Sequence, residues 1–333
     1  MAILVSGGTG FIGSHTCVEL LNKGEEVIIF DNLSNSKREV VGKIERITGK
    51  KAKFYKADML DKDALEKIFG ENDIEAVVHF AGYKAVGESV HVPLKYFENN
   101  IVGTIYLCET MKKHNCKKMV FSSSATVYGM KNKSPLSEEM PLSVTNPYGR
   151  TKLMIEDMLR DICTADSEWG VMLLRYFNPI GAHKSGLIGE DPNGIPTNLL
   201  PNIVNAVTKK NGPLKVFGSD YPTRDGSCVR DYIHVEDLAA GHVCALKELR
   251  RRNGIEAVNL GTGNGYSVFE IIDAFEKVNG VKVPYEIVGR RDGDVAECYA
   301  NPEKAKRIFK WNATRGISEM CADLWNYVLT NRK

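Results

Sequence analysis

The sequence lacks the marks of several large classes of protein. Its 333 residues contain no apolar run long enough for a transmembrane helix, and no signal peptide is recognisable at the N-terminus. The 44 Lys and Arg residues stand against 42 Asp and Glu residues, a formal net charge of +2, so there is no basic excess of the kind that binds nucleic acid. We therefore expect a cytoplasmic protein that binds neither nucleic acid nor membrane.

Cysteine is present but lacks the spacing of a metal site or a disulfide framework. The eight cysteines are scattered along the chain and form no C-x-x-C pair. The hydrophobic share of 43% and the charged share of 26% are those of an ordinary globular protein. We therefore expect no metal and predict that most of the thiols pack in the core.

Strand and helix patterns alternate through the N-terminal third of the chain. Short β-branched runs occur at residues 2–6, 26–31, 52–57, 75–80 and 118–122, with longer helical patterns between them. Such alternation is typical of a parallel sheet with helices on both faces, where ligands bind at the carboxyl ends of the strands. The sequence thus predicts an α/β fold: a Rossmann-type doubly wound parallel sheet with a smaller C-terminal α/β substrate lobe.

Two lobes are expected because 333 residues exceed the size at which one hydrophobic core usually stops growing. Residues 178–197 have the Gly, Pro, Asn and Asp content of loops and mark the entry to the second lobe. A helical pattern near 235–249 and a strand near 257–259 indicate a return to the first domain. The predicted division is 1–177 for the nucleotide-binding Rossmann domain, with returning segments near 230–262, and 178–333 mainly for the second lobe.

A glycine-rich motif follows the first predicted strand directly. Gly7, Gly10 and Gly13 satisfy G-x-x-G-x-x-G, and a helical pattern follows at 14–23, which is the context of a dinucleotide-binding fingerprint. The glycines permit close approach of the backbone to a pyrophosphate, and the helix N-terminus offers unpaired N–H groups. The alternative is a glycine-rich turn without a ligand.

Asp31 ends the second predicted strand. A carboxylate there accepts hydrogen bonds from the adenosine ribose and repels the 2′-phosphate of NADP, which favours NAD. Lys37 and Arg38 are cations nearby that could bind the 2′-phosphate, so NADP remains an alternative. Asp31 could also have a purely structural role, as a turn-forming residue before Asn32. Asp58 follows the third strand, where it can bond the adenine.

Tyr148 and Lys152 form Y-x-x-x-K at the start of a predicted helix, a spacing that puts both on one face. Ser124 follows the fifth strand, which faces the nicotinamide in a doubly wound sheet. Lys152 and the positive nicotinamide ring both favour phenolate, so we expect a lowered pKa for Tyr148 and a base that removes a hydroxyl proton, with Ser124 holding or relaying it. A lone surface pair is the alternative.

These motifs, with the run R-D-Y-I-H-V at 230–235, resemble the extended short-chain dehydrogenase/reductase family over nearly the whole chain. Within it, the runs at 84–89, 122–129, 174–179 and 189–192 are similar to the C4 epimerases of UDP-hexoses. The resemblance implies an NAD that stays bound through the cycle. Tyr148 takes the O4 proton while NAD takes the C4 hydride, which then returns to the other face of the 4-keto sugar.

The resemblance also implies the residues of the site. Ser124, Tyr148 and Lys152 are the expected catalytic residues. Expected NAD contacts are Gly7, Gly10, Phe11, Ile12, Gly13, Asp31, Asn32, Asn35, Ser36, Asp58, Met59, Phe80, Ala81, Gly82, Lys84, Asn99, Ser124, Tyr148, Lys152 and Phe177. Expected UDP-hexose contacts are Lys84, Ser124, Tyr148, Asn178, Asn198, Leu199, Lys215, Val216, Phe217, Arg230, Arg291, Asp294 and Cys298. The arginines suit a diphosphate, with surface ion pairs as the alternative.

One position bears on specificity. Epimerases of the family restricted to unmodified hexoses carry a tyrosine four residues after the aspartate matching Asp294, whereas this chain has Cys298 there and Tyr299 next. A small side chain leaves room for a 2-N-acetyl group. The sequence therefore predicts that UDP-N-acetylglucosamine and UDP-N-acetylgalactosamine are also interconverted, unless a shift of one residue puts Tyr299 in that place.

Three other functions remain open from the sequence. A nucleotide-sugar dehydratase needs an acid beside Ser124, where Ala125-Thr126-Val127 stands instead. A uronate epimerase or decarboxylase is the second alternative, and a non-catalytic NAD-binding sensor or scaffold is the third. The resemblance further implies a homodimer through helices near 93–113 and 146–161, although an apolar stripe there is equally typical of ordinary core.

Overall fold

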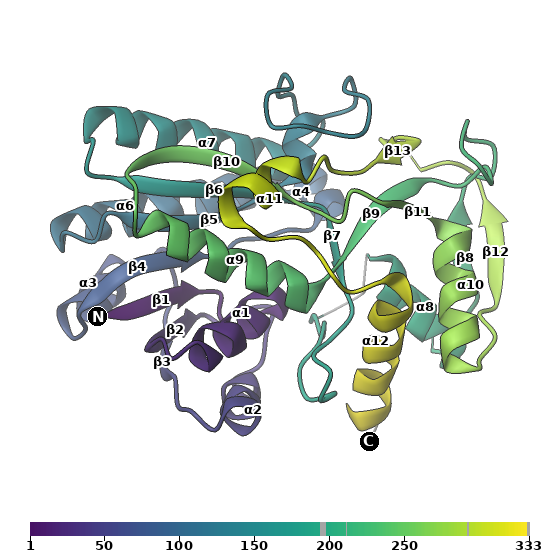
Figure 1. The fold of residues 1–333 in the computed structure, drawn as a ribbon, viewed down its shortest axis with the longest axis horizontal. Helices are drawn as coiled ribbons and strands as arrows, with labels where there is room; N and C mark the ends of the chain where they lie inside the picture. The colour runs from purple at the N-terminus through teal and green to yellow at the C-terminus, as the bar shows by residue number, and fades with distance from the viewer. Residues whose placement is uncertain (194–197, 211, 292, 332–333) are drawn as a thin grey trace.

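The computed structural model describes residues 1–193, 198–210, 212–291 and 293–331. Its main sheet has seven strands, all parallel, in the order β10-β6-β5-β4-β1-β2-β3 (Figure 1). The strands are β1 Ala2–Ser6, β2 Val27–Asp31, β3 Lys53–Lys56, β4 Ile74–His79, β5 Lys118–Ser124, β6 Gly170–Tyr176 and β10 Gly254–Leu260. The predicted doubly wound parallel sheet is confirmed, and its winding direction reverses between β1 and β4.

Helices cover both faces of this sheet because alternate side chains of the strands point to opposite sides. Ile3 and Val5 of β1 pack in one core cluster, and Ala2 and Leu4 pack in the other. The first cluster includes residues of α1 Phe11–Asn22, α2 Glu39–Thr48, α9 Val235–Leu249 and α11 Glu303–Phe309. The second includes residues of α3 Lys62–Gly70, α6 Gly103–Lys113 and α7 Pro147–Ala165. Figure 1 shows α1 and α9 on one side of the sheet and α6 and α7 on the other.

The segment between β4 and α6 is helical but irregular. It contains α4 Val86–His91, α5 Pro93–Tyr96 and a π-helical turn, η1, at Phe97–Val102. Such π-turns occur often at functional sites because they displace side chains from the regular helical face. Here the turn carries Asn99 and Asn100, and Asn100 bonds both backbone groups of Tyr83 in the loop after β4.

The second lobe is built on two small sheets. β7 Asn178–Ile180, β9 Val229–His234, β11 Gly265–Ser267 and β13 Glu297–Cys298 form one, and β8 Leu214–Phe217 pairs with β12 Tyr285–Val288 in the other. Its core contains residues of α8 Leu199–Val207, α10 Val268–Asn279 and α12 Ile317–Asn331. The lobe lies at the right of Figure 1. In contrast, α9 packs against α1 and β10 pairs with β6, so this later stretch of the chain joins the main sheet.

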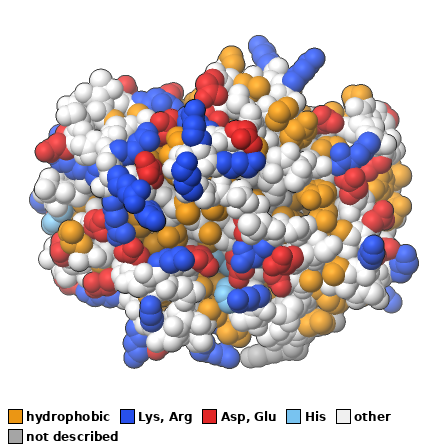
Figure 2. Space-filling view, viewed as in Figure 1, with side chains coloured by type: hydrophobic (Ala, Val, Ile, Leu, Met, Phe, Trp, Pro, Cys, Tyr) orange, Lys and Arg blue, Asp and Glu red, His pale blue; other side chains and the backbone are white. Residues whose placement is uncertain are grey.

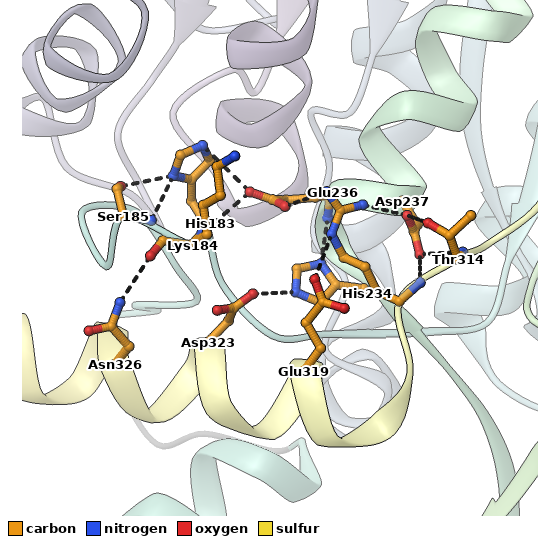
Figure 3. A network of polar contacts seen from close by, with 11 residues as sticks. His183, Lys184, Ser185, His234, Glu236, Asp237, Thr314, Glu319, Asp323 and Asn326 are labelled. Atoms are coloured by element: carbon orange, nitrogen blue, oxygen red, sulfur yellow. Dashed lines mark hydrogen bonds and ion pairs between the residues drawn. The ribbon is translucent and has the colours of Figure 1, made fainter. Parts of the chain in front are cut away.

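A polar network fastens α12 to the segment that leads into the cleft (Figure 3). Arg315, just before α12, pairs with Glu236 at the start of α9, with 2.7 Å between Nη2 and Oε2. Asn326 of α12 donates to the carbonyl of Lys184 at 3.0 Å. The network thus restrains the chain just before residues 189–193, which line the cleft described below.

Charge is evenly distributed on the face drawn in Figure 2. Lys and Arg side chains are interspersed with Asp and Glu there, in keeping with the formal net charge of +2. All eight cysteines are free, and only Cys244 and Cys298 are partly exposed. Among the described residues, no helix is both long and apolar enough to span a membrane.

Candidate active site

A cavity of about 550 Å³ opens where β1, β2, β4, β5 and β6 end. Every residue predicted to contact NAD lies in its wall, from Gly7 of the glycine loop to Phe177 after β6. Of the residues predicted to contact the UDP-hexose, the wall includes Lys84, Ser124, Tyr148, Asn178 and Asn198. The remaining ones, Leu199, Lys215, Val216, Phe217, Arg230, Arg291, Asp294 and Cys298, lie in the second lobe and are not among the described wall residues.

The glycine loop between β1 and α1 fits a pyrophosphate. Gly7 has φ of 68°, and a Cβ on Gly13 would stand 2.3 Å from the Gly7 carbonyl oxygen, so neither position accommodates a side chain. Gly10 is the N-cap of α1 and provides no side-chain cap. The first N–H groups of α1 are therefore available to an anion in the cavity.

Asp31 holds its carboxylate at the end of β2 by hydrogen bonds from the surrounding loops. Its oxygens accept from the Thr9 amide at 3.2 Å, the Leu33 amide at 2.8 Å and the Ser36 hydroxyl at 3.0 Å. The two cations that kept NADP open have other partners. Lys37 pairs with Asp191, and the Arg38 guanidinium lies over the Phe54 ring at 5.1 Å. This arrangement favours a ribose hydroxyl over a phosphate beside Asp31.

Tyr148 and Lys152 project from the first turns of α7. Asn146 caps this helix by accepting from the Gly149 amide at 2.8 Å, and Pro147 occupies the first helical position, where its missing N–H is harmless. The Tyr148 and Lys152 side chains are 9% and 6% exposed, so α7 places both inside the cavity wall. The Lys152 Nζ donates to the Ser122 carbonyl at 2.7 Å and lies 6.0 Å from the centre of the Tyr148 ring.

Burial dominates the electrostatics of the pair in the protein alone. Burial raises the pKa of Tyr148 above its ordinary value, although a hydrogen bond with Ser124 acts in the opposite direction. Burial also lowers the pKa of Lys152 to about 8, while the negative charge of Glu156 raises it. In the protein alone, desolvation of the buried phenolate thus outweighs its neighbours. The lowered pKa of Tyr148, which we predicted from Lys152 together with the nicotinamide ring, stays a prediction for the protein with NAD bound.

Sequence reasoning missed the contacts of the acidic loop at residues 189–193, which also lines the cavity. Glu190 accepts from Lys84 Nζ at 3.1 Å and from Asn198 Nδ2 at 2.8 Å, so one carboxylate joins two predicted contact residues. Asn193 donates its amide N–H to Asn35 Oδ1 at 2.9 Å. The run at 189–192 carried only the family resemblance, and no local spacing indicated that it would reach these partners.

The second-lobe residues form a cluster of their own around Asp294. Its carboxylate lies 3.4 Å from Arg230 Nη2 and 2.9 Å from Arg291 Nη2. The Arg291 guanidinium also lies over the Phe217 ring at 5.5 Å. Val216 is fully buried in the lobe's core, so only its backbone is available for a ligand. Two guanidinium groups sharing one carboxylate leave net positive charge for a phosphate.

Cys298 and Tyr299 pack in different places. The Cys298 side chain packs against a buried cluster that contains Val127 and Phe177, and Phe177 also lines the cavity. The Tyr299 ring lies instead against Gly265 of β11.

Comparison with known proteins gives consistent matches over the chain. The profile of the NAD dependent epimerase/dehydratase family matches residues 3–261. A UDP-glucose 4-epimerase of Bacillus subtilis (strain 168) is 60% identical over 331 residues, covering 99% of this chain and 98% of the relative. The crystal structure of UDP-glucose 4-epimerase from Bifidobacterium longum in complex with NAD+ and UDP has a TM-score of 0.96 and 50% identity, with 99% of each chain covered. The UDP-Glc/GlcNAc 4-epimerase from Campylobacter jejuni has a TM-score of 0.87 and 35% identity, again with 99% of each chain covered.

Proposed function

This chain belongs to the NAD dependent epimerase/dehydratase family, and on that premise we propose that it is an NAD-dependent isomerase that interconverts UDP-glucose and UDP-galactose. The observation that carries the proposal is one shared cavity, which brings Ser124, Tyr148 and Lys152 to the glycine loop. The dehydratase, uronate and sensor alternatives are not favoured, because relatives 50–60% identical over nearly the full length are UDP-glucose 4-epimerases.

The residues of the cavity perform the proton transfer. Bound NAD supplies the acceptor and donor of hydride at C4. Tyr148, as phenolate, takes the proton of the O4 hydroxyl, and Ser124 positions that hydroxyl. Because burial raises the pKa of Tyr148, the phenolate depends on positive charge nearby. The Lys152 ammonium and the oxidised cofactor bring that charge.

The second lobe holds the UDP part while the sugar presents its other face. Arg230 and Arg291 suit the diphosphate through bidentate hydrogen bonds, and the exposed ring of Phe217 suits the uracil. Asn178 and Asn198 at the cavity wall suit the sugar or the phosphates. These assignments are supported by the position of the cluster at the end of β8, the start of β9 and the short strand β13.

The acetylated sugars are included in the proposal. Cys298 packs beside Phe177 of the cavity wall, and a thiol there leaves more space than a phenol. Purified protein should interconvert UDP-N-acetylglucosamine and UDP-N-acetylgalactosamine as well as the unmodified pair. If the acetylated pair is not turned over, the proposed activity on acetylated sugars is refuted, whereas the proposed activity on UDP-glucose and UDP-galactose is not affected.

We also propose a cytoplasmic homodimer. Leu94 of α5 is 79% exposed, and Met154, Met158 and Ile162 lie one turn apart or nearly so along α7. Helices α5 to α7 are thus suited to pack against a second copy. Light scattering at micromolar concentration tests the dimer, and a monomer would contradict it. The free thiols support a reducing compartment, which cell fractionation tests.

The decisive test of the activity uses the protein purified without added cofactor. Denaturation should release NAD, which mass spectrometry detects. The protein should also convert UDP-galactose to UDP-glucose in a coupled assay. Protein that carries NAD yet converts neither UDP-sugar would refute the epimerase and return the sensor to consideration.

A further inference from the structure

We propose that Glu156 is a positioning residue of the active site, which keeps the ammonium of Lys152 charged and in place through the buried pair that it forms with Arg175. The inference rests on the proposed epimerase activity and adds a residue to its mechanism. The sequence patterns did not single out Glu156, and Arg175 was named only within the run at 174–179 that carried the resemblance. Neither residue is among the described residues that line the cavity.

The first observation is a series of three side chains on one face of α7. Tyr148, Lys152 and Glu156 follow one another at intervals of four residues, so they lie on one face of the helix. That face packs on β5. The Ser122 carbonyl accepts from Lys152 at 2.7 Å, and the Ser123 hydroxyl donates to Glu156 Oε1 at 2.5 Å. Successive residues of β5 thus form hydrogen bonds with successive members of this series on α7.

The second observation is a complete burial of charge. Glu156 is 0% exposed and Arg175 of β6 is 1% exposed. Arg175 donates to both carboxylate oxygens of Glu156, from Nε to Oε1 at 2.9 Å and from Nη2 to Oε2 at 2.5 Å. Replacing such a pair by apolar residues is often neutral or stabilising, so stability alone does not account for it. A role in the electrostatics of the adjacent catalytic lysine does.

The third observation is the composition of the groups around Lys152 and Glu156. Ser122 and Ser123 of β5 are uncharged, and His79 of β4 is neutral because burial lowers its pKa to about 3. The other titratable or charged groups are Tyr148, Asp157 and Arg160 on α7, Arg175 and Tyr176 on β6, and Tyr128 on the short helix η2 Ala125–Tyr128. Among these groups Glu156 is the carboxylate on the lysine's own helical face, one turn away.

The consequence is a defined effect on pH dependence. Burial lowers the pKa of Lys152 to about 8, and the charge of Glu156 limits that fall. Loss of the carboxylate lowers the pKa of Lys152 further, so the ammonium loses its proton at a lower pH. Activity that requires charged Lys152 beside the Tyr148 phenolate then declines at a lower pH. If the Glu156–Arg175 pair were purely structural, its loss would reduce stability or rate without moving the falling limb of the pH profile.

The test compares Glu156→Gln with Glu156→Asp in full pH profiles of kcat/KM for UDP-galactose. Both variants disturb packing, but only the first removes the charge. In Glu156→Gln the falling limb should move down by about one pH unit, the lower end of the effect of a neighbouring charge. In Glu156→Asp it should stay at the wild-type position. Tyr128→Phe, which removes a hydroxyl 3.3 Å from Arg175 Nη1, is the structural control and should leave the limb unmoved.

Equal profiles for the Gln and Asp variants would overturn the proposal, because the charge would then have no separate effect. Should Glu156→Gln fail to fold, the double variant Glu156→Gln with Arg175→Met removes both members of the pair and leaves no unpaired buried charge. The falling limb should move in the same direction there but by less, because the opposing charge of Arg175 is lost together with the carboxylate. An unshifted limb in the double variant would overturn the proposal. Lack of epimerase activity in the unaltered protein would refute the proposed function instead, which is a separate outcome.

Discussion

Lys37 forms an ion pair with Asp191, 154 residues further along the chain, and both side chains line the same cavity. Lys37 follows β2 on the adenosine side of the predicted NAD site, whereas Asp191 belongs to the segment that α12 restrains. Asn193 reinforces the link through hydrogen bonds to Asn35 and to the carbonyl of Ser34. Two distant loops are thereby joined beside the place assigned to the cofactor.

We expect Lys37→Gln to weaken retention of NAD. Exposed ion pairs contribute up to about 1 kcal/mol, so the dissociation rate of NAD should rise by up to about fivefold. NAD content after extended dialysis, measured by mass spectrometry, checks this. Lys62→Gln breaks a comparable exposed pair with Glu109 away from the glycine loop and should retain NAD as the wild type does. Equal loss in both variants would contradict a specific role of the Lys37 link.

Tyr148→Phe should abolish most activity without unfolding the protein. Loss of a positioned base typically lowers rates by about 100-fold to 10,000-fold. The buried phenol makes no other described hydrogen bond than that with Ser124, so melting temperature and NAD content should remain near wild type. Steady-state kinetics together with thermal unfolding check this. A variant with unchanged kcat would show that another group takes the O4 proton.

Gly13→Ala should prevent NAD binding. The added Cβ would stand 2.3 Å from the Gly7 carbonyl oxygen, and this backbone contact cannot be relieved without distorting the loop that receives the pyrophosphate. Gly42→Ala is the matched control, because Gly42 lies within α2 with nothing within 4 Å of its Cβ position. The control should bind NAD normally and gain about 0.5–1 kcal/mol of stability. Normal NAD content in Gly13→Ala would refute the predicted cradle.

Cys298→Tyr should separate the two sugar pairs. A phenol beside Phe177 overfills the space proposed for the acetyl group, so kcat/KM for UDP-N-acetylgalactosamine should fall by roughly fivefold to 150-fold, as overpacking of about 1–3 kcal/mol implies. The rate with UDP-galactose should change little. Cys298→Ala serves as control and should keep both activities. Parallel losses on both sugar pairs would mean that Cys298 does not discriminate between them.

Much of the fold could be predicted because its signals are local. The glycine loop follows β1 directly, and every strand of the N-terminal third lies within a residue or two of its predicted range. The helix that presents Tyr148 and Lys152 begins at Pro147, as the first-turn preference of proline indicates. Periodicity, capping and spacing act over a few residues, so one sequence suffices to read them.

Long-range partners could not be predicted in the same way. The carboxylate of Glu190 joins Lys84 to Asn198, and Asp191 selects Lys37, yet nothing in the spacing of these residues indicates the pairing. The raised pKa of Tyr148 in the protein alone could not be predicted for a related reason. The direction of the pKa shift depends on how completely α7 buries the phenol against β5. Desolvation depends on packing and not on neighbours in the sequence.

The amino-acid order by itself thus determined the dinucleotide fold, the glycine loop and the tyrosine–lysine pair, because each depends on backbone geometry repeated over one turn or one strand. Only the tertiary structure decided that Arg175 would pair with Glu156, one helical turn from Lys152. Burial and ion pairing arise where distant segments meet, and their energies depend on distance and solvent exclusion that no linear spacing contains.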